Sequence, residues 1–147
     1  MSTTHVPTHP TTAEDGTDPA VADRNLRTVL RVDAVVSAVS GLALAVAPNA
    51  LDDVLGTGQP GAVRAVGIAF LLYAAEVALL SRAGTATLRR FAPAVVVANE
   101  LYVVATVATI TLGWYATAGA VLVAAAGAVV GGLAIAQWRS TRAMGRG

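Results

Sequence analysis

The sequence predicts an all-α membrane protein, a bundle of four transmembrane helices with both termini on the cytoplasmic side. The 147 residues are 55% hydrophobic and 13% charged, with a mean hydropathy of +0.64. An ordinary soluble domain is far less apolar. The apolar residues also gather in four runs of about 20 residues, which is the length a helix needs to cross a hydrocarbon core about 30 Å thick.

The four runs cover residues 28–47, 62–81, 91–112 and 116–137. Inside a bilayer each run must be helical, because any other open structure would leave backbone groups without hydrogen-bond partners. The segment "ALDDVLG" between the first two runs predicts a short amphipathic helix at the outer surface. We therefore expect one transmembrane domain over residues 24–138 and a short basic cytoplasmic tail over residues 139–147.

Residues 1–23 are rich in Thr and Pro and show no apolar periodicity, which predicts a disordered cytoplasmic tail. The segment lacks the basic start and apolar stretch of a signal peptide. His5 and His9 lie in this tail without a further ligand, so we expect no metal site there. The chain has no Cys, which excludes disulfides and thiolate ligands.

The arginines predict the orientation of the bundle. Arg64 stands alone at the start of the second run, where we expect it to reach the outer interface or pair with Asp52 or Asp53. By the positive-inside rule, the side with the other arginines is cytoplasmic, and the composition suggests the plasma (inner) membrane of a bacterium. Those nine arginines, before the first run, between the second and third, and after the fourth, are Arg24, Arg27, Arg31, Arg82, Arg89, Arg90, Arg139, Arg142 and Arg146.

Four acidic or amide side chains lie within the apolar runs, and each needs a physical reason because a charge inside a span costs several kcal/mol. At 1.5 Å per residue from the nearest arginine, Asp33 lies near the cytoplasmic interface and Glu76 about 9 Å deep. Asn99 and Glu100 lie roughly 14 Å deep, near the middle of the membrane. Ion pairs with neighbouring arginines, Arg31 for Asp33 and Arg82 for Glu76, are one way to offset the charge.

Helical spacing predicts two polar stripes that face each other or a shared interior. Small and hydroxyl residues of this kind hold membrane helices together. Gly127 and Gly131 form a GxxxG pair in the fourth run, which predicts close packing within the bundle or in a dimer. The first stripe holds Asp33, Ser37, Ser40, Gly41 and Leu44, and the second holds Asn99, Tyr102, Thr106, Thr109 and Gly113.

Glu76 and Glu100 lie outside these stripes, among Val and Leu, where a carboxylate would be protonated or paired. Three interpretations stay open. The polar residues are structural contacts of the bundle, or Glu100 meets its own copy at a subunit interface. Alternatively, a cytoplasm-facing cavity binds a proton, a cation or a small polar ligand, and the residues expected to line it are Asp33, Glu76, Asn99, Glu100 and Tyr102.

Several function classes are excluded or disfavoured. No His lies in a run and no Cys exists, so ligation of haem through these residues is excluded. The HExxH, Walker, GxSxG and SxxK motifs are absent, and we expect no enzyme, cofactor or metal. A net charge of +1 with few aromatic residues argues against nucleic-acid binding. The expected partners are the lipid bilayer and either a second copy or another membrane subunit.

The stretches "LRVDAVVSAVSGLALAVAPNALDDVLG", "VRAVGIAFLLYA", "NELY" and "AQWRSTR" resemble small uncharacterised four-span membrane proteins of actinobacterial type. The overall layout is similar to the DoxX-like four-helix proteins, some of which are linked to quinone or thiosulfate redox chemistry. This second likeness carries over no catalytic residue. The shared positions are Arg31, Asp33, Arg64, Gly67, Asn99 and Tyr102.

The sequence thus predicts an integral membrane protein with a non-enzymatic, structural or accessory role. A small carrier or channel that uses its intramembrane carboxylates is the alternative. A DoxX-like membrane oxidoreductase subunit is the third possibility, and it rests on the resemblance.

Overall fold

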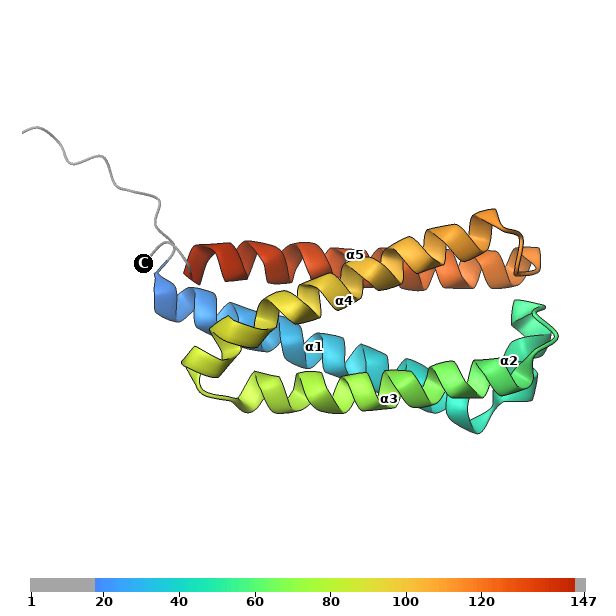
Figure 1. The fold of residues 1–147 in the computed structure, drawn as a ribbon, viewed down its shortest axis with the longest axis horizontal. Coiled ribbons are helices and arrows are strands. Elements are labelled where there is room, and N and C mark those ends of the chain that lie inside the picture. The colour runs from blue at the N-terminus through green and yellow to red at the C-terminus, as the bar shows by residue number, and fades with distance from the viewer. Residues whose placement is uncertain (1–17, 145–147) are drawn as a thin grey trace, which may run out of the picture.

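The computed structural model describes residues 18–144, which form five helices and no strand (Figure 1). Four of the helices are long and apolar enough to cross a membrane, with mean hydropathies of 1.7 to 2.2 over their most apolar windows. This confirms the predicted all-α fold with four long apolar helices. The five helices are α1 (Pro19–Val46), α2 (Pro48–Leu55), α3 (Pro60–Arg82), α4 (Thr85–Thr111) and α5 (Thr117–Met144).

Three helices extend beyond the apolar runs at the end of the bundle that carries the arginines. α1 begins at Pro19, so the prediction of disorder is wrong for residues 19–23. Asp18 caps this helix, because its side chain accepts a hydrogen bond of 2.9 Å from the amide of Ala20, and proline suits the first helical position. An apolar run marks only the hydrophobic part of a helix. Helices α4 and α5 continue beyond their apolar runs through turns that are more polar. His5 and His9 lie outside the described residues.

The long helices form two closely packed pairs, α1 with α3 and α4 with α5 (Figure 1). α1 also packs against α5 and joins the pairs, whereas α3 and α4 touch at few points. The start of α1, the end of α5 and the α3–α4 connection lie at one end of the bundle, and α2 lies at the other. This arrangement leaves the facing sides of α3 and α4 less covered than the rest of the interior.

Two glycines allow α1 and α3 to cross at close range. A Cβ atom added to Gly41 would lie 2.8 Å from the carbonyl oxygen of Gly67, and one added to Gly67 would lie 2.6 Å from the amide nitrogen of Ala45. Real Cβ atoms do not approach backbone this closely. Gly41, the glycine of the first predicted stripe, therefore packs against the second long helix, α3.

Glycine also permits close packing between α4 and α5. A Cβ atom added to Gly127 would lie 2.9 Å from Cγ2 of Thr106, and one added to Gly131 would lie 3.7 Å from Cγ2 of Val103. The GxxxG pair of the fourth run thus contacts α4 within the bundle. Thr106, a member of the second predicted stripe, faces α5.

The short helix α2 closes the far end of the bundle. The amide of Ala116 donates a 2.8 Å hydrogen bond to the carbonyl oxygen of Leu55, which ties the end of α2 to the start of α5. Asp52 is buried, and its Oδ1 accepts hydrogen bonds from the Thr57 hydroxyl and from the Gln59 amide. This carboxylate thus organises the turn that leads into α3.

We predict that Gly67→Ala lowers the free energy of unfolding in detergent or bilayer by about 1–3 kcal/mol, the usual cost of overpacking. Gly132→Ala is the matched control in α5, since nothing lies within 4 Å of the added Cβ. It should be neutral or stabilise the helix by up to about 1 kcal/mol. Equal stability of the two variants would contradict the close α1–α3 crossing.

Candidate functional site

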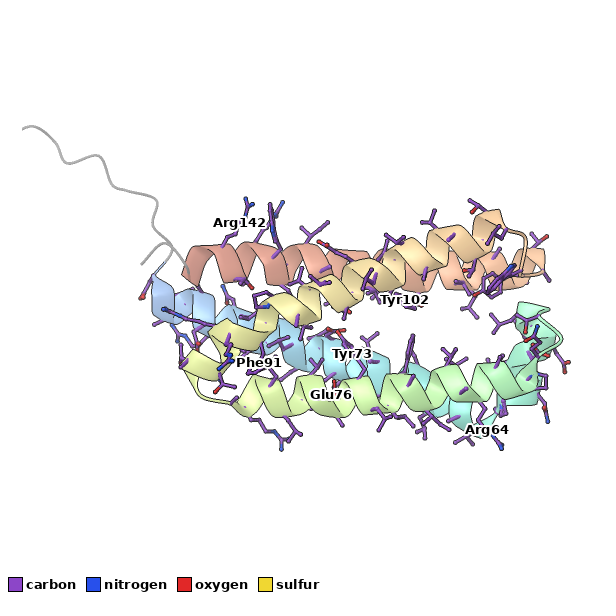
Figure 2. The ribbon with its side chains drawn as sticks, in the orientation of Figure 1. Arg64, Tyr73, Glu76, Phe91, Tyr102 and Arg142 are labelled. Atoms are coloured by element: carbon purple, nitrogen blue, oxygen red, sulfur yellow. The ribbon has the colours of Figure 1, made fainter. Side chains whose placement is uncertain are left out.

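Four polar side chains, one from each long helix, meet inside the bundle. They are Asp33 of α1, Tyr73 of α3, Asn99 of α4 and Gln137 of α5, and we call them the polar cluster. Asp33, Asn99 and Gln137 are 1%, 4% and 0% exposed, and Tyr73, labelled in Figure 2, is half-buried. The cluster is therefore closed from its surroundings except on the side of Tyr73.

Helix length brings Asp33 and Asn99 to the same level. Each lies 14 residues after the first residue of its helix, Pro19 for α1 and Thr85 for α4. Counting from the nearest arginine placed Asp33 near the interface and Asn99 near the middle of the membrane, which is wrong because the two side chains are hydrogen-bonded to each other. Long arginine side chains extend along the helix to reach water, so the position of an arginine does not fix the depth of its neighbours.

Asp33 Oδ2 is the centre of the cluster. It accepts a 3.0 Å hydrogen bond from Asn99 Nδ2 and a 2.9 Å hydrogen bond from Gln137 Nε2, and Tyr73 Oη lies 3.1 Å away. Asn99 Nδ2 also donates to Gln137 Oε1 at 3.1 Å, and Tyr73 Oη donates to Asn99 Oδ1 at 2.8 Å. Both amides thus use their oxygen and their nitrogen, and one carboxylate oxygen links α1 to the other three long helices.

The second oxygen of the carboxyl group, Asp33 Oδ1, is different. It is buried and has no hydrogen-bond partner among the described residues. A buried polar atom without a partner costs about 1–3 kcal/mol. Ser37, one turn further along α1, is also buried. The free oxygen shows that the cluster uses only half of the carboxyl group to hold the helices.

The hydrogen bonds decide which faces of the helices meet. Lipid is as apolar as a leucine side chain, so apolar contact between membrane helices provides little preference for one face over another. Interhelical hydrogen bonds average about 0.6 kcal/mol in membrane proteins and reach about 1.7 kcal/mol. Several such bonds converging on Asp33 favour a single arrangement of α1, α4 and α5.

The structure brings together some of the residues that the sequence singled out. Asp33 and Asn99 join in the polar cluster. Tyr102 lies apart from it, and its ring packs edge-on against Phe70 of α3 with 5.5 Å between the ring centres. Glu100 does not join either, because its side chain points away from the cluster, about 100° around α4 from Asn99, and is exposed. The face of α4 that carries Asn99 therefore points into the bundle, and the face that carries Glu100 does not.

The suggested ion pairs with Asp33 and Glu76 are absent. Arg31 and Arg82 are both exposed, and residues 18–144 contain a single salt bridge, between Arg27 and Asp23. These arginines extend toward solvent, which is why they leave the carboxyl groups without a cation. Arg64 is exposed too, and the same range shows no salt bridge from it to Asp52 or Asp53.

Arg27 of α1 binds the C-terminal end of α3. Its Nε atom lies 2.7 Å from Asp23 Oδ2, and its NH1 nitrogen donates hydrogen bonds of 3.1 Å and 2.7 Å to the carbonyl oxygens of Ser81 and Ala83. A cation at a helix C-terminus satisfies free carbonyl groups and is favoured by the helix dipole. The contact fastens the α3–α4 connection to α1.

Sequence reasoning missed Gln137 and Tyr73 as members of the cluster. Gln137 ends the fourth apolar run two residues before Arg139, a position near the membrane interface where a glutamine needs no partner. Tyr73 lies in the second apolar run, outside both predicted polar stripes. Position along the helix does not reveal them either. Gln137 and Tyr73 lie 7 and 9 residues from the arginine-rich ends of α5 and α3, whereas Asp33 and Asn99 lie 14 residues from those of α1 and α4.

A groove of about 490 Å³ runs between α3 and α4 on the side of Tyr73. Glu76 lines it from α3 and Phe91 from α4, and both are labelled in Figure 2. The remaining lining is mostly Ala, Val and Leu. Tyr73 belongs to both features, so its side chain separates the groove from the polar cluster. Within residues 18–144, no three acidic or histidine side chains gather as a metal site.

No protein-family model matches the chain, and neither a curated protein nor a solved structure is significantly similar to it. The resemblance to DoxX-like proteins therefore stays a prediction. Function has to be argued from the cluster, the groove and the distribution of charge.

We predict that Asn99→Leu lowers the free energy of unfolding by about 1–3 kcal/mol, because it removes one donor from Asp33 Oδ2 and leaves the buried Gln137 Oε1 without a hydrogen-bond partner. Glu100→Leu, one residue further along α4, is the matched control. It removes an acid from an exposed apolar surface and should not destabilise the protein. Reversible unfolding in mixed micelles measures both, and equal losses would contradict the assignment of the two faces.

Proposed function

We propose that this chain is a multi-pass integral protein of the bacterial plasma membrane, with both termini cytoplasmic, and that it has a structural or accessory role. The observation that carries the proposal is the closed polar cluster. The amide groups of Asn99 and Gln137 form hydrogen bonds with each other and with Asp33. These bonds hold the helices in place, and few donors or acceptors remain to bind a substrate.

The outer surface of the bundle supports residence in a membrane. Large apolar side chains are exposed on every long helix, a surface that a soluble monomer rarely shows. Lipid would cover these side chains at no cost. Examples, each more than 60% exposed, are Val35, Val39, Val46, Leu72, Leu79, Leu101, Val104 and Val121.

The charge at the two ends of the bundle supports the orientation. The arginines of α1, of the α3–α4 connection and of the end of α5 gather at the end where the described chain starts and finishes. Arg64 is the one described arginine near the other end. At the arginine-rich end, the Arg142 guanidinium lies 3.8 Å from the centre of the Trp138 ring, a pairing suited to the membrane interface.

The orientation makes a prediction that cysteine labelling can check without background, since the chain has no Cys. Asp53→Cys and Ala86→Cys both place a thiol at an exposed position, at opposite ends of the bundle. In intact spheroplasts, a membrane-impermeant maleimide should label the first variant and spare the second. The second should react only after the membrane is opened. The reverse pattern would contradict cytoplasmic termini.

A small carrier is the second candidate, and the groove between α3 and α4 favours it. Glu76 brings a carboxyl group into this mostly apolar groove, and no salt bridge engages it in the described range. A volume of about 490 Å³ is within the usual range of small-molecule sites. A carboxyl group beside Phe91 suits an apolar molecule that carries one positive charge.

Native mass spectrometry from lipid particles separates the two candidates. For an accessory subunit, we expect protein purified from its own membrane to carry a second polypeptide or a second copy at fixed stoichiometry. A lone chain with a small molecule that is lost in Glu76→Gln, and retained in Glu100→Gln, would instead favour the carrier. A lone chain without either would contradict both.

A further inference from the structure

The oxygen atom of Tyr73 has more contacts than its single proton can serve. Tyr73 Oη lies 2.8 Å from Asn99 Oδ1 and 3.1 Å from Asp33 Oδ2, and both neighbours are acceptors when Asp33 is ionised. A phenol has one O–H donor and can also accept. With an ionised Asp33, one of these two close oxygen–oxygen contacts would therefore contain no hydrogen.

Rotating the amide groups does not remove the conflict. If Asn99 and Gln137 both exchanged oxygen for nitrogen, Asn99 could donate to Tyr73. Both amide oxygens would then face Asp33 Oδ2, at 3.0 Å and 2.9 Å, with no donor between them. Amide orientation is assigned from the hydrogen-bond network, and this network favours amide nitrogens facing Asp33.

The surroundings of Asp33 supply no positive charge to balance an anion. The groups that face it are Tyr73 from α3, Asn99 from α4 and Gln137 from α5, which are all neutral donors. On its own helix, Arg31 is exposed, and Arg27 pairs with Asp23. An ionised Asp33, which is 1% exposed, would therefore be a buried charge without a partner cation.

We propose that the polar cluster is a binding site for one proton, carried by Asp33 as a neutral carboxylic acid. With that proton on Oδ2, Asp33 donates to Tyr73 Oη, and Tyr73 donates to Asn99 Oδ1. Asn99 donates to Gln137 Oε1 and to Asp33, and Gln137 donates to Asp33. Every contact in the cluster then contains one hydrogen. This proposal deepens the structural role proposed above and rests on the same cluster.

The proton also links the cluster to the groove. Tyr73 is the one cluster member that lines the groove, so proton exchange is expected to depend on its hydroxyl group. Loss of the proton would leave an uncompensated charge in the interior and one oxygen–oxygen contact without a hydrogen. Loss of the proton would weaken the hydrogen bond between Tyr73 and Asn99, which joins α3 to α4.

Infrared spectroscopy of the full chain in lipid bilayers, with [4-¹³C]aspartate incorporated, tests the proposal. At neutral pH we expect one protonated carboxylic acid band that shifts with the label, which assigns it to aspartate. Asp33→Asn should abolish this band, whereas Asp53→Asn, at an exposed aspartate, should keep it. Tyr73→Phe should keep the band and change its frequency, because the acid loses its acceptor. A structural role alone would not move that frequency.

Absence of an isotope-sensitive acid band at neutral pH would overturn the proposal, as would a band that survives in Asp33→Asn. If Asp33→Asn does not fold, the wild-type chain still decides the matter, because Asp33–Ala34 is the one Asp–Ala pair in the sequence. Labelling with [¹³C]Asp and [¹⁵N]Ala therefore assigns its carboxyl signal in solid-state NMR. If Asp33 is ionised and Asn99→Leu still destabilises the protein, the proton-binding proposal is refuted and the structural role stands.

Discussion

The structure depends on the hydrogen bonds that converge on one oxygen atom, Asp33 Oδ2. Donors from α4 and α5 reach this atom, and the hydroxyl group of α3 lies beside it, so it connects all four long helices. In a bilayer the apolar faces of these helices could pair in several ways with similar energies. A buried polar group has far fewer acceptable arrangements, because leaving it unpaired is costly. The polar cluster thus selects one arrangement. Gly41 and Gly67 allow the backbones of α1 and α3 to approach closely, and Gly127 leaves room for the Thr106 side chain between α4 and α5.

Much of this fold could be predicted from the sequence, because its main determinants are local. The length of the apolar runs gave four helices, and the composition of "ALDDVLG" gave the short helix α2. Helical spacing placed Asn99 and Glu100 on different faces, and the structure buries the first and exposes the second. Helix ends were less predictable, because the arginine-rich turns continue the helices beyond their apolar part. Asp18 and Pro19 were the available signal for the start of α1.

The membership of the polar cluster was harder to foresee, because it depends on the relative height of four helices. A rule that measures depth from the nearest arginine separated Asp33 from Asn99, although the two share a hydrogen bond. By the same rule Gln137, two residues before Arg139, would lie near the interface. Glu76 and Glu100 are the more conspicuous residues in the sequence because they are ionisable, whereas the structure uses two amides and a phenol as partners of Asp33. In apolar surroundings a neutral donor satisfies a carboxyl group without the desolvation cost of a second charge, and such donors are less conspicuous in a sequence than ionisable residues.

The central claim is that the donors of α4 and α5 meet at the carboxyl group of α1, and an internuclear distance tests it most directly. Solid-state NMR can measure the dipolar coupling between ¹³Cγ of Asp33 and the side-chain ¹⁵N atoms of Asn99 and Gln137 in lipid bilayers. We predict strong couplings to both amides, as hydrogen bonds of 3.0 Å and 2.9 Å to Oδ2 require. Absence of both couplings in folded protein would contradict the account, because the helices would then be held together by another set of contacts.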